Sequence, residues 1–290
     1  MTSFVQYLIS GLAAGSIYAI IALGFVLVFK ATDVFNFAQG SLMMMGAFFS
    51  LTALSTFGLP LGPAVLLVLL ASAVVGILMH LLVIRPMLGQ PLLTLVMATF
   101  AVSLIVKAII AMSYGAAEKS LPTTLPDDVL LVAGVRVSVL DLITIGVSLA
   151  CMLGFGLFFR RTSLGLQMRA TAESSEAAML SGIDVNRVFV VTFAIAVALA
   201  ALGGFLLANV QLVSPSLADL GLLALPAAVV GGLTSIPGAV VGGLLVGVLQ
   251  SLGAGYVSAS GRDVFVYLVL LLVLLVRPWG LLGTREIVRV

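Results

Sequence analysis

Residues 7–29 read YLISGLAAGSIYAIIALGFVLVF, an apolar stretch without a charged side chain. A helix needs about 20 apolar residues to cross the hydrocarbon core of a bilayer. The apolar region of a secretory signal peptide is shorter, about 7–15 residues, and follows a positively charged segment. No positive charge precedes this stretch. We therefore expect it to be the first transmembrane helix of the mature chain.

The same apolar character extends over the whole sequence. Of 290 residues, 62% are hydrophobic and 8% are charged, and the mean hydropathy is +1.33. Soluble domains have about 25% charged residues, because they need a wetted surface. The composition therefore places the chain in a lipid bilayer, and its net charge of +2 gives no reason to expect a nucleic-acid partner.

Apolar segments of nearly spanning length recur along the chain, and we expect each to be a transmembrane helix: 6–29, 34–57, 61–84, 91–113, 139–159, 187–211 and 263–282. The stretch 217–257 is long enough for two spans but is interrupted by prolines and glycines, so it could form two short spans or a re-entrant pair. The predicted fold is an all-α, polytopic transmembrane bundle of about eight or nine spans, some of them Gly/Pro-broken or re-entrant. Residues 1–290 are expected to form a single domain.

Charges outside these segments predict the orientation. The loop 160–186 contains Arg160, Arg161 and Arg169, whereas the loop 114–138 is mildly acidic. Cytoplasmic loops of membrane proteins carry an excess of Lys and Arg. We therefore expect loop 160–186 and the C-terminus in the cytoplasm and loop 114–138 outside. The N-terminus is then also outside, provided that 217–257 enters the membrane and returns.

Small residues recur at four-residue spacing in two segments. One set lies in the first span, and the other lies late in the broken region: Gly11 and Gly15, then Gly243, Gly247, Ser251 and Gly255. In lipid there is little hydrophobic drive between helices, so close backbone approach favours their association. These stripes predict helix–helix contacts and no particular activity.

The cytoplasmic loop has a helical pattern. Residues 168–180 are good helix formers, and Gly182 lies where such a helix would end. An apolar face would consist of Met168, Thr171, Ala172, Ala178 and Met179, opposite a polar side with Arg169, Glu173 and Glu176. Such a helix could lie in a groove of a soluble partner. The alternatives are a helix on lipid headgroups or a simple solvated loop.

Several motifs of the chain are similar to those of a known family. Glu176-Ala177-Ala178-x-x-x-Gly182 resembles the Glu-Ala-Ala loop by which ABC importer permeases engage their ATPases, although the usual later Ile and Leu-Pro are absent. Further stretches resemble the branched-chain amino acid ABC transporter permease family, in order along nearly the whole chain: Gly15–Gly24, Asn36–Ala47, Gly231–Gly243 and Arg277–Gly283.

The resemblance implies a permease subunit that imports branched-chain amino acids or a related small solute by alternating access across the bacterial inner membrane. It also implies a second homologous permease subunit, two cytoplasmic ATP-binding subunits that hold ATP and Mg²⁺, and a periplasmic or extracellular solute-binding protein. Segment 160–187 would be the cytoplasmic coupling segment. Its expected ATPase-coupling residues are Arg169, Glu173, Glu176, Ala177, Ala178 and Gly182.

Two segments combine glycine or proline with polar residues at membrane depth or its edge. Irregular backbone is tolerated there only when it is buried in protein or lines a wet cavity, and transporters often bind solutes at such breaks. The hypothesis is that Asn36, Gln39, Ser41, Thr234 and Ser235 lie on or near the translocation pathway. The alternative is that they are helix caps and interhelical hydrogen-bonding groups.

A few polar residues stand alone in apolar surroundings, and each has an expected role. Lys107 interrupts an apolar run; a charge inside the membrane is a functional candidate, yet the lysine stem can reach the interface, and we favour this snorkelling. Asp219 could be a helix cap or an outer-gate residue. His80 is expected to be structural. Cys151, the single cysteine, allows neither an intrachain disulfide nor a cysteine metal site, and no metal site is expected.

Motifs for catalysis are missing from the sequence. It contains no Gly-x-x-x-x-Gly-Lys-Ser/Thr, no His-Glu-x-x-His and no Gly-x-Ser-x-Gly. We therefore expect no enzyme activity and no cofactor in this chain, with energy supplied by another subunit. The competing interpretation is a stand-alone channel or secondary transporter for a small solute such as urea, which would usually carry more intramembrane acidic residues for ion coupling.

Overall fold

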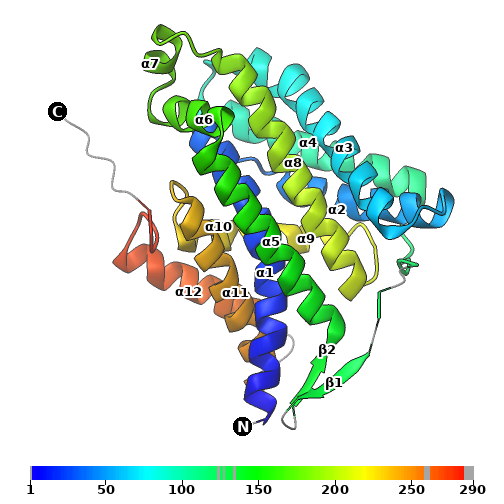
Figure 1. The fold of residues 1–290 in the computed structure, drawn as a ribbon. Helices are drawn as coiled ribbons and strands as arrows, with labels where there is room; N and C mark the ends of the chain where they lie inside the picture. The colour runs from blue at the N-terminus through cyan, green and yellow to red at the C-terminus, as the bar shows by residue number, and fades with distance from the viewer. Residues whose placement is uncertain (1, 123–124, 127, 133–134, 258–261, 284–290) are drawn as a thin grey trace. The chain divides into compact units, whose positions relative to one another are not determined.

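The computed structural model describes residues 2–122, 125–126, 128–132, 135–257 and 262–283. Two short strands, β1 (Val129–Val132) and β2 (Val135–Ser138), accompany a series of α-helices (Figure 1). The helices are α1 (Thr2–Thr32), α2 (Gln39–Leu51), α3 (Leu61–Met79), α4 (Leu92–Tyr114), α5 (Val139–Arg161), α6 (Ser163–Glu173), α7 (Ser175–Leu180), α8 (Val185–Val210), α9 (Leu217–Leu222), α10 (Ala224–Gly231), α11 (Ile236–Tyr256) and α12 (Arg262–Val276). The π-helical turn Thr52–Thr56 follows α2, and the turns His80–Ile84 and Arg85–Met87 follow α3.

The chain divides into two compact units. Unit 1 comprises residues 1–26, 125–149 and 223–290, and unit 2 comprises residues 27–124 and 150–222. Helices α1 and α5 are each divided between the two units, with one part in unit 1 and the other part in unit 2. Unit 1 otherwise holds the β-hairpin and α10 to α12, and unit 2 holds α2 to α4 and α6 to α9.

Six helices in the described part of the chain are long and apolar enough to cross a membrane: α1, α3 with its following turns, α4, α5, α8 and α11. The predicted count of eight or nine spans is not confirmed, because several expected spans form shorter helices. Helix α2 has 13 residues and α12 has 15, which at 1.5 Å per residue is about 20 Å, less than the ~30 Å of a hydrocarbon core.

Glycine and proline explain where α10 and α12 end. Gly232 has a φ of +111° and ends α10, a conformation that glycine adopts without steric cost. Pro278 follows α12 and disfavours helical backbone at the residue before it. The stretch 217–257 therefore divides into α9, α10 and α11, of which only α11 has spanning length.

The prediction of an all-α fold needs a correction in the loop 114–138. There β1 and β2 form an antiparallel pair with Val129 opposite Ser138 and Leu130 opposite Val137. Both strands are rich in valine, a residue that favours extended backbone because its branched side chain packs well on a pleated surface. The fold is nearly all-α.

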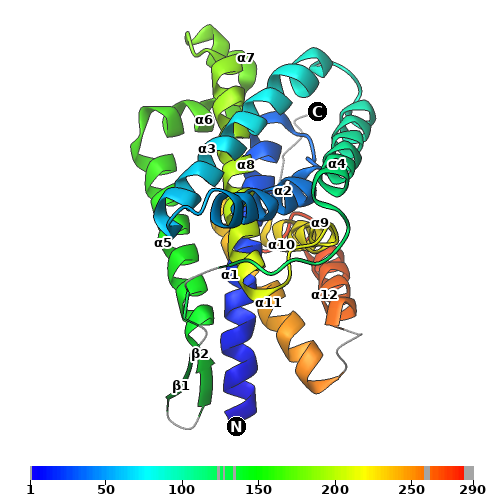
Figure 2. The same ribbon diagram turned by 90° about the vertical axis from the view of Figure 1, so that its right-hand side faces the viewer.

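Helix α2 is the core of unit 2. Every residue of α2 except Phe49 is buried, and α2 contacts α3, α4, α8 and α9 (Figure 2). Glycines bring the backbones together: a methyl group at Gly204 of α8 would overlap the carbonyl of Met43, and one at Gly46 would overlap Ala201. A methyl at Gly40 would overlap the carbonyl of Ala218 in α9. Side chains larger than hydrogen are excluded from these contacts.

In unit 1, α1 packs against α11 through the two predicted stripes of small residues. Gly15 lies against Gly247, and Gly243 lies against Ala19, so that in each case an added methyl group would meet backbone atoms. Beside these contacts the Tyr18 hydroxyl donates to Oε1 of Gln250 at 2.7 Å. The predicted contact role of the stripes is confirmed.

The Gly204→Ala variant tests the backbone contact of α8 with α2. We expect it to lose about 1–3 kcal/mol of folding free energy or more, as overpacked cores do, and its apparent melting temperature in detergent to fall by about 4 °C or more. The control is Gly154→Ala, because nothing lies within 4 Å of a methyl group at that position of α5. Equal melting temperatures for the two variants would contradict the contact.

Candidate functional site

Two buried polar residues at the start of α2 are linked by hydrogen bonds. The side-chain oxygen of Asn36 accepts a hydrogen bond from the Ala38 amide at 3.1 Å, and its Nδ2 donates to Oε1 of Gln39 at 3.3 Å. Nε2 of Gln39 in turn donates to the Ala196 carbonyl of α8 at 3.1 Å. Asn36 and Gln39 are 1% and 0% exposed. They therefore fix the chain at the start of α2 and attach α2 to α8 from inside unit 2.

Helix α4 presents a row of polar side chains to α2 and α9, which we call the polar seam: Thr99, Ser103, Lys107 and Tyr114. Residues four or seven apart lie on one face of a helix. Thr99 Oγ1 accepts from the Phe37 amide at 3.2 Å, and the Ser103 hydroxyl lies 2.7 Å from that of Ser41. The Tyr114 hydroxyl bonds to Thr52. The seam thus attaches α4 to α2 and to the residues directly before and after α2.

The opposite side of α4 is apolar and exposed. It consists of Ile105, Ile109 and Met112, each more than half exposed, whereas Phe100 and Leu104, also at least half exposed, border the seam. Helix α4 therefore has two distinct faces, one for protein and one suited to lipid.

Lys107 forms an ion pair that its local sequence did not predict. Its Nζ lies 2.6 Å from Oδ1 of Asp219 in the first turn of α9. The Asp219 side chain is 68% exposed and that of Lys107 is 31% exposed. A lone Lys or Asp at the centre of a transmembrane helix costs about 2.5–3.5 kcal/mol on the translocon-derived scale, so pairing two such charges removes a large penalty.

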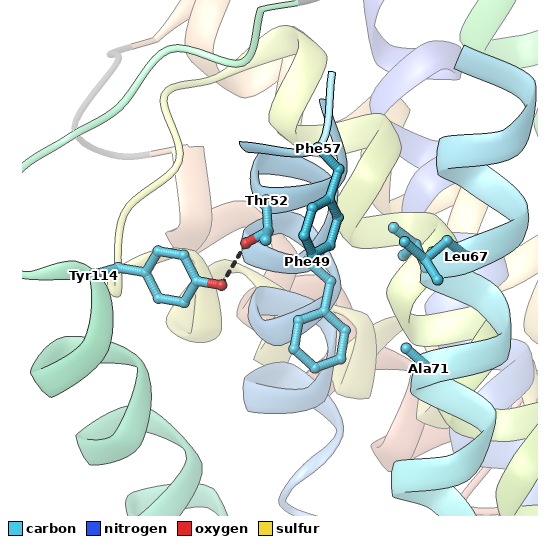
Figure 3. A pocket seen from close by; sticks show the side chains of 7 residues that line it. Phe49, Thr52, Phe57, Leu67, Ala71 and Tyr114 are labelled. Atoms are coloured by element: carbon cyan, nitrogen blue, oxygen red, sulfur yellow. Dashed lines mark hydrogen bonds between the residues drawn. The ribbon is translucent and has the colours of Figure 1, made fainter. Parts of the chain in front are cut away.

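A cavity of about 240 Å³ lies at the Tyr114 end of the seam (Figure 3). Its lining is mostly apolar and comes from α2, the π-helical turn, α3 and α4: Phe49, Thr52, Phe57, Leu67, Val68, Ala71 and Tyr114. The hydrogen bond between Thr52 and Tyr114 provides its polar edge. The cavity suits an aliphatic group better than a charged one.

The other two predicted pathway residues, Thr234 and Ser235, belong to unit 1. The Ser235 hydroxyl caps α11 by accepting from the Gly238 amide at 3.1 Å. The amides of Leu281 and Leu282 donate to the carbonyls of Val230 and Gly231 at 2.8 and 3.0 Å. Two motifs far apart in sequence therefore meet within unit 1. Asn36, Gln39 and Ser41 cluster within unit 2, and the structure does not bring all five residues together within one unit.

The segment 160–187 contains two helices where one was predicted over 168–180. Ser174 has extended backbone and caps α7 by accepting from the Ala177 amide at 3.2 Å, which breaks the helix. Thr162 caps α6 in the same way through Gly165. Gly182, with a φ of +81°, follows the end of α7 as predicted.

The sides of α6 and α7 differ in exposure. Met168, Thr171 and Ala178 are buried, and Ala178 packs against Val185 and Phe189. Glu173, Glu176 and Ala177 are exposed. Met179 was expected on the apolar face, but it is 55% exposed and the adjacent Leu180 is 90% exposed. The free surface of α7 therefore combines carboxylates with apolar side chains.

Arg169 does not extend into solvent. Its guanidinium lies 5.9 Å from the ring centroid of Phe159 and donates to the Arg160 carbonyl at 3.5 Å. This contact attaches α6 to the end of α5 within unit 2.

His80 lies 3.4 Å from Asn186 and packs beside the rings of Phe189 and Phe193. No metal-binding group of three His, Cys, Asp or Glu side chains occurs among the described residues.

The chain was compared with known proteins. The family model described as branched-chain amino acid transport system / permease component matches residues 7–274. The chain belongs to this permease family.

Curated relatives match almost end to end. The high-affinity branched-chain amino acid transport system permease protein BraD of Pseudomonas aeruginosa is 35% identical over 99% of this chain and 98% of its own length. The corresponding protein LivH of Escherichia coli is 30% identical over 99% and 98%. Among solved structures, PsaBC from Streptococcus pneumoniae in complex with Fab gives a TM-score of 0.49 and 14% identity, over 94% of this chain and 91% of that chain.

As a member of the branched-chain amino acid permease family with six apolar helices of spanning length, the chain is a multi-pass membrane protein. The apolar face of α4 then has lipid as its natural neighbour.

Sequence reasoning identified Ser41 but missed its partner Ser103, as well as Thr99 and Tyr114. The available signal was the recurrence of polar residues at four- and seven-residue spacing in α4.

The Gln39→Leu variant tests the hydrogen bonds at the start of α2. It removes the link to the Ala196 carbonyl and leaves the Asn36 side-chain amide without its acceptor, and an unsatisfied buried polar group costs about 1–3 kcal/mol. We expect less folded protein after membrane extraction and a lower melting temperature. The control Gln90→Leu changes an exposed glutamine in a turn and should leave both quantities unchanged. A stable Gln39→Leu protein would contradict the structural role of this side chain.

Proposed function

We propose that the chain is the membrane subunit of an ABC importer that moves branched-chain amino acids, or a related small solute, into the cell across the bacterial inner membrane. The observation that carries this proposal is the near end-to-end similarity to BraD and LivH, both named as permease proteins of high-affinity branched-chain amino acid transport systems. Residues 1–290 act as one permease domain.

The remaining parts of the importer are other chains. The sequence has no phosphate-binding loop of its own, so two cytoplasmic subunits bind ATP and Mg²⁺ and supply the energy. A second homologous permease completes the membrane part, and a periplasmic or extracellular binding protein delivers the solute. Transport follows alternating access, in which closure of the ATPases rearranges the helices around the pathway.

The segment 160–187 transmits that closure. Glu173 and Glu176 are exposed and available to a soluble partner, together with Ala177 and the apolar side chains of Met179 and Leu180. The buried side chains of the same segment, including Ala178, pack on unit 2. Gly182 provides the turn into α8, and Arg169 holds α6 against α5. A push on α7 therefore reaches the bundle through packed contacts.

The pathway follows the interrupted segments. Asn36, Gln39 and Ser41 hold the start of the short helix α2, and Ser235, next to Thr234, caps the start of α11. Irregular backbone of this kind lines the solute path in transporters. In this proposal α2, α9 with α10, and α12 are partial or re-entrant segments that raise the count of membrane-embedded segments to eight or nine.

The direct test is uptake by the assembled importer. The chain is co-expressed and purified with its candidate partner subunits, reconstituted into liposomes with the binding protein outside, and supplied with radiolabelled leucine and internal ATP. We expect leucine uptake that requires ATP, the binding protein and this chain. Uptake at full rate without ATP would instead support a stand-alone channel or secondary transporter.

Glu176→Lys tests the coupling segment. A reversed charge at an interface places like charges together, and we expect about a tenfold weaker association with the ATPase subunits, equivalent to 1.4 kcal/mol. Retention of the ATPases on the tagged permease is measured by quantitative pull-down. The matched control is Glu118→Lys, which reverses a carboxylate in the loop 114–138. Wild-type retention by the Glu176→Lys permease would count against the assignment.

The orientation is tested by labelling single cysteines in a Cys151→Ser background. A cysteine introduced by Ser181→Cys, next to α7, should react with a membrane-impermeant maleimide only after the inner membrane is opened. A cysteine introduced by Glu118→Cys should react in intact spheroplasts, because loop 114–138 is external in this proposal. The reverse pattern of labelling would overturn the proposed orientation.

A further inference from the structure

The ion pair of Lys107 and Asp219 is the one salt bridge within the part of the chain that the structure describes. Lys107 lies about 10 Å of helix rise from the end of α4 at Tyr114, within a segment of spanning length. Asp219 belongs to α9, a short helix in the interrupted region. Both charges are therefore placed at a broken segment inside a membrane protein, where charged residues are usually functional.

The exposed side of this ion pair does not suit lipid. The Asp219 side chain is 68% exposed, and an ionised carboxylate open to hydrocarbon is strongly disfavoured. The exposed apolar face of α4 with Ile105, Ile109 and Met112 is opposite the seam that includes Lys107. Asp219 must therefore face water or another polar surface, as the wall of a solute pathway would.

Helix α9 is held by backbone contacts as well as by the ion pair. Gly40 and Gly221 bring the backbones of α2 and α9 into direct contact. The segment before α9 is held by two backbone hydrogen bonds between Lys119 and Val213, at 2.8 and 2.9 Å. Because backbone contacts already position α9, the two charges are available for another role.

The ion pair also has unused hydrogen-bonding capacity. An ammonium group has three donors and a carboxylate has two acceptor oxygens. Among the described residues, one Lys107 donor and one Asp219 oxygen, Oδ1, are engaged, and they are engaged with each other. A ligand that carries one positive and one negative group could insert between them and leave each charge paired.

We propose that Lys107 and Asp219 form the subsite for the head group of a zwitterionic amino acid, with the carboxylate of the solute on Lys107 and its ammonium on Asp219. The inference rests on the proposed transport function and deepens it. Without solute the two side chains close on each other, as observed at 2.6 Å. With solute each pairs with the opposite charge of the amino acid, so no unpaired charge faces the membrane interior in either state.

The half-buried Leu222 lies one helical turn beyond Asp219 on α9. Residues three apart share a helix face, so an apolar surface adjoins the charged subsite. A zwitterion with an aliphatic side chain matches this combination better than a simple amine, a carboxylic acid or an uncharged amide.

The test uses the assembled, reconstituted importer and radiolabelled leucine. Lys107→Met and Asp219→Asn each remove one charge, and leucine uptake should fall about tenfold or more, since truncating one member of a charge pair leaves its ligand partner unmatched. The control Glu118→Gln neutralises an exposed carboxylate outside the seam and should keep wild-type uptake. Wild-type uptake by both seam variants would overturn the subsite.

Exchanging the two charges distinguishes a solute-binding role of the ion pair from a purely structural role. The double variant Lys107→Asp/Asp219→Lys restores an ion pair between α4 and α9 but reverses its polarity, so the amino acid would have to bind with its side chain turned away from Leu222. We expect normal assembly with uptake still about tenfold low. If uptake returns to the wild-type rate, the pair is structural and the inference fails.

Wild-type protein supplies a measurement that depends on no variant. The melting temperature of the purified importer, without binding protein, should rise with leucine and not with leucinamide or 4-methylpentanoate, each of which lacks one of the two charges. No rise with leucine, or an equal rise with all three compounds, would refute the subsite.

Failure of the subsite and failure of the proposed function can be told apart. If the wild-type importer takes up no leucine at all, the proposed function fails for this solute. Normal leucine uptake by the wild-type importer and by the variants would refute only the subsite.

Discussion

Close contact between helix backbones is the constraint on which unit 2 depends. Lipid gives apolar helices little reason to associate, so attraction must come from atoms that approach closely. Glycines at positions 40, 46, 204 and 221 allow α8 and α9 to lie directly against α2. The contact of α9 with α2 holds Asp219 on the same side of unit 2 as its partner Lys107 in α4, and Ser41 of α2 meets Ser103 of α4. Glycine packing and polar interactions therefore act together in unit 2.

Helix α4 shows how one span can serve two environments. Its apolar side is exposed, and its seam makes hydrogen bonds or an ion pair at four positions: Thr99, Ser103, Lys107 and Tyr114. A buried polar group is stable in a low-dielectric interior only when it has a partner. Each seam residue has a partner on another segment of unit 2, which is why so polar a face can exist on an apolar helix.

Part of this architecture follows directly from local sequence. The long apolar runs predicted five of the six helices of spanning length, all except α11 in the interrupted stretch 217–257, and the small-residue stripes predicted the packing of α1 on α11. The positive φ of Gly182 was predictable because glycine is favoured at the end of a helix. These features depend on composition and on spacing over a few turns.

Other features depend on the tertiary fold. Lys107 and Asp219 are 112 positions apart, and nothing local to either residue indicates the other, so Lys107 alone suggested snorkelling. The break at Ser174 was missed because the flanking residues are good helix formers, while the serine satisfies the Ala177 amide through its own side chain. Asn36 and Gln39 were recognised as important, yet only the structure shows that they bond to each other and to α8.

The burial of α2 has a consequence for the response to the surrounding bilayer. Helices α3, α4 and α5 are mostly exposed, so wherever they meet acyl chains they must tilt or adjust when membrane thickness changes. Helix α2 has almost no surface that could sense such a change. Hydrophobic mismatch is therefore absorbed by the outer spans, and the register between α2 and its partners is insulated from differences in lipid chain length.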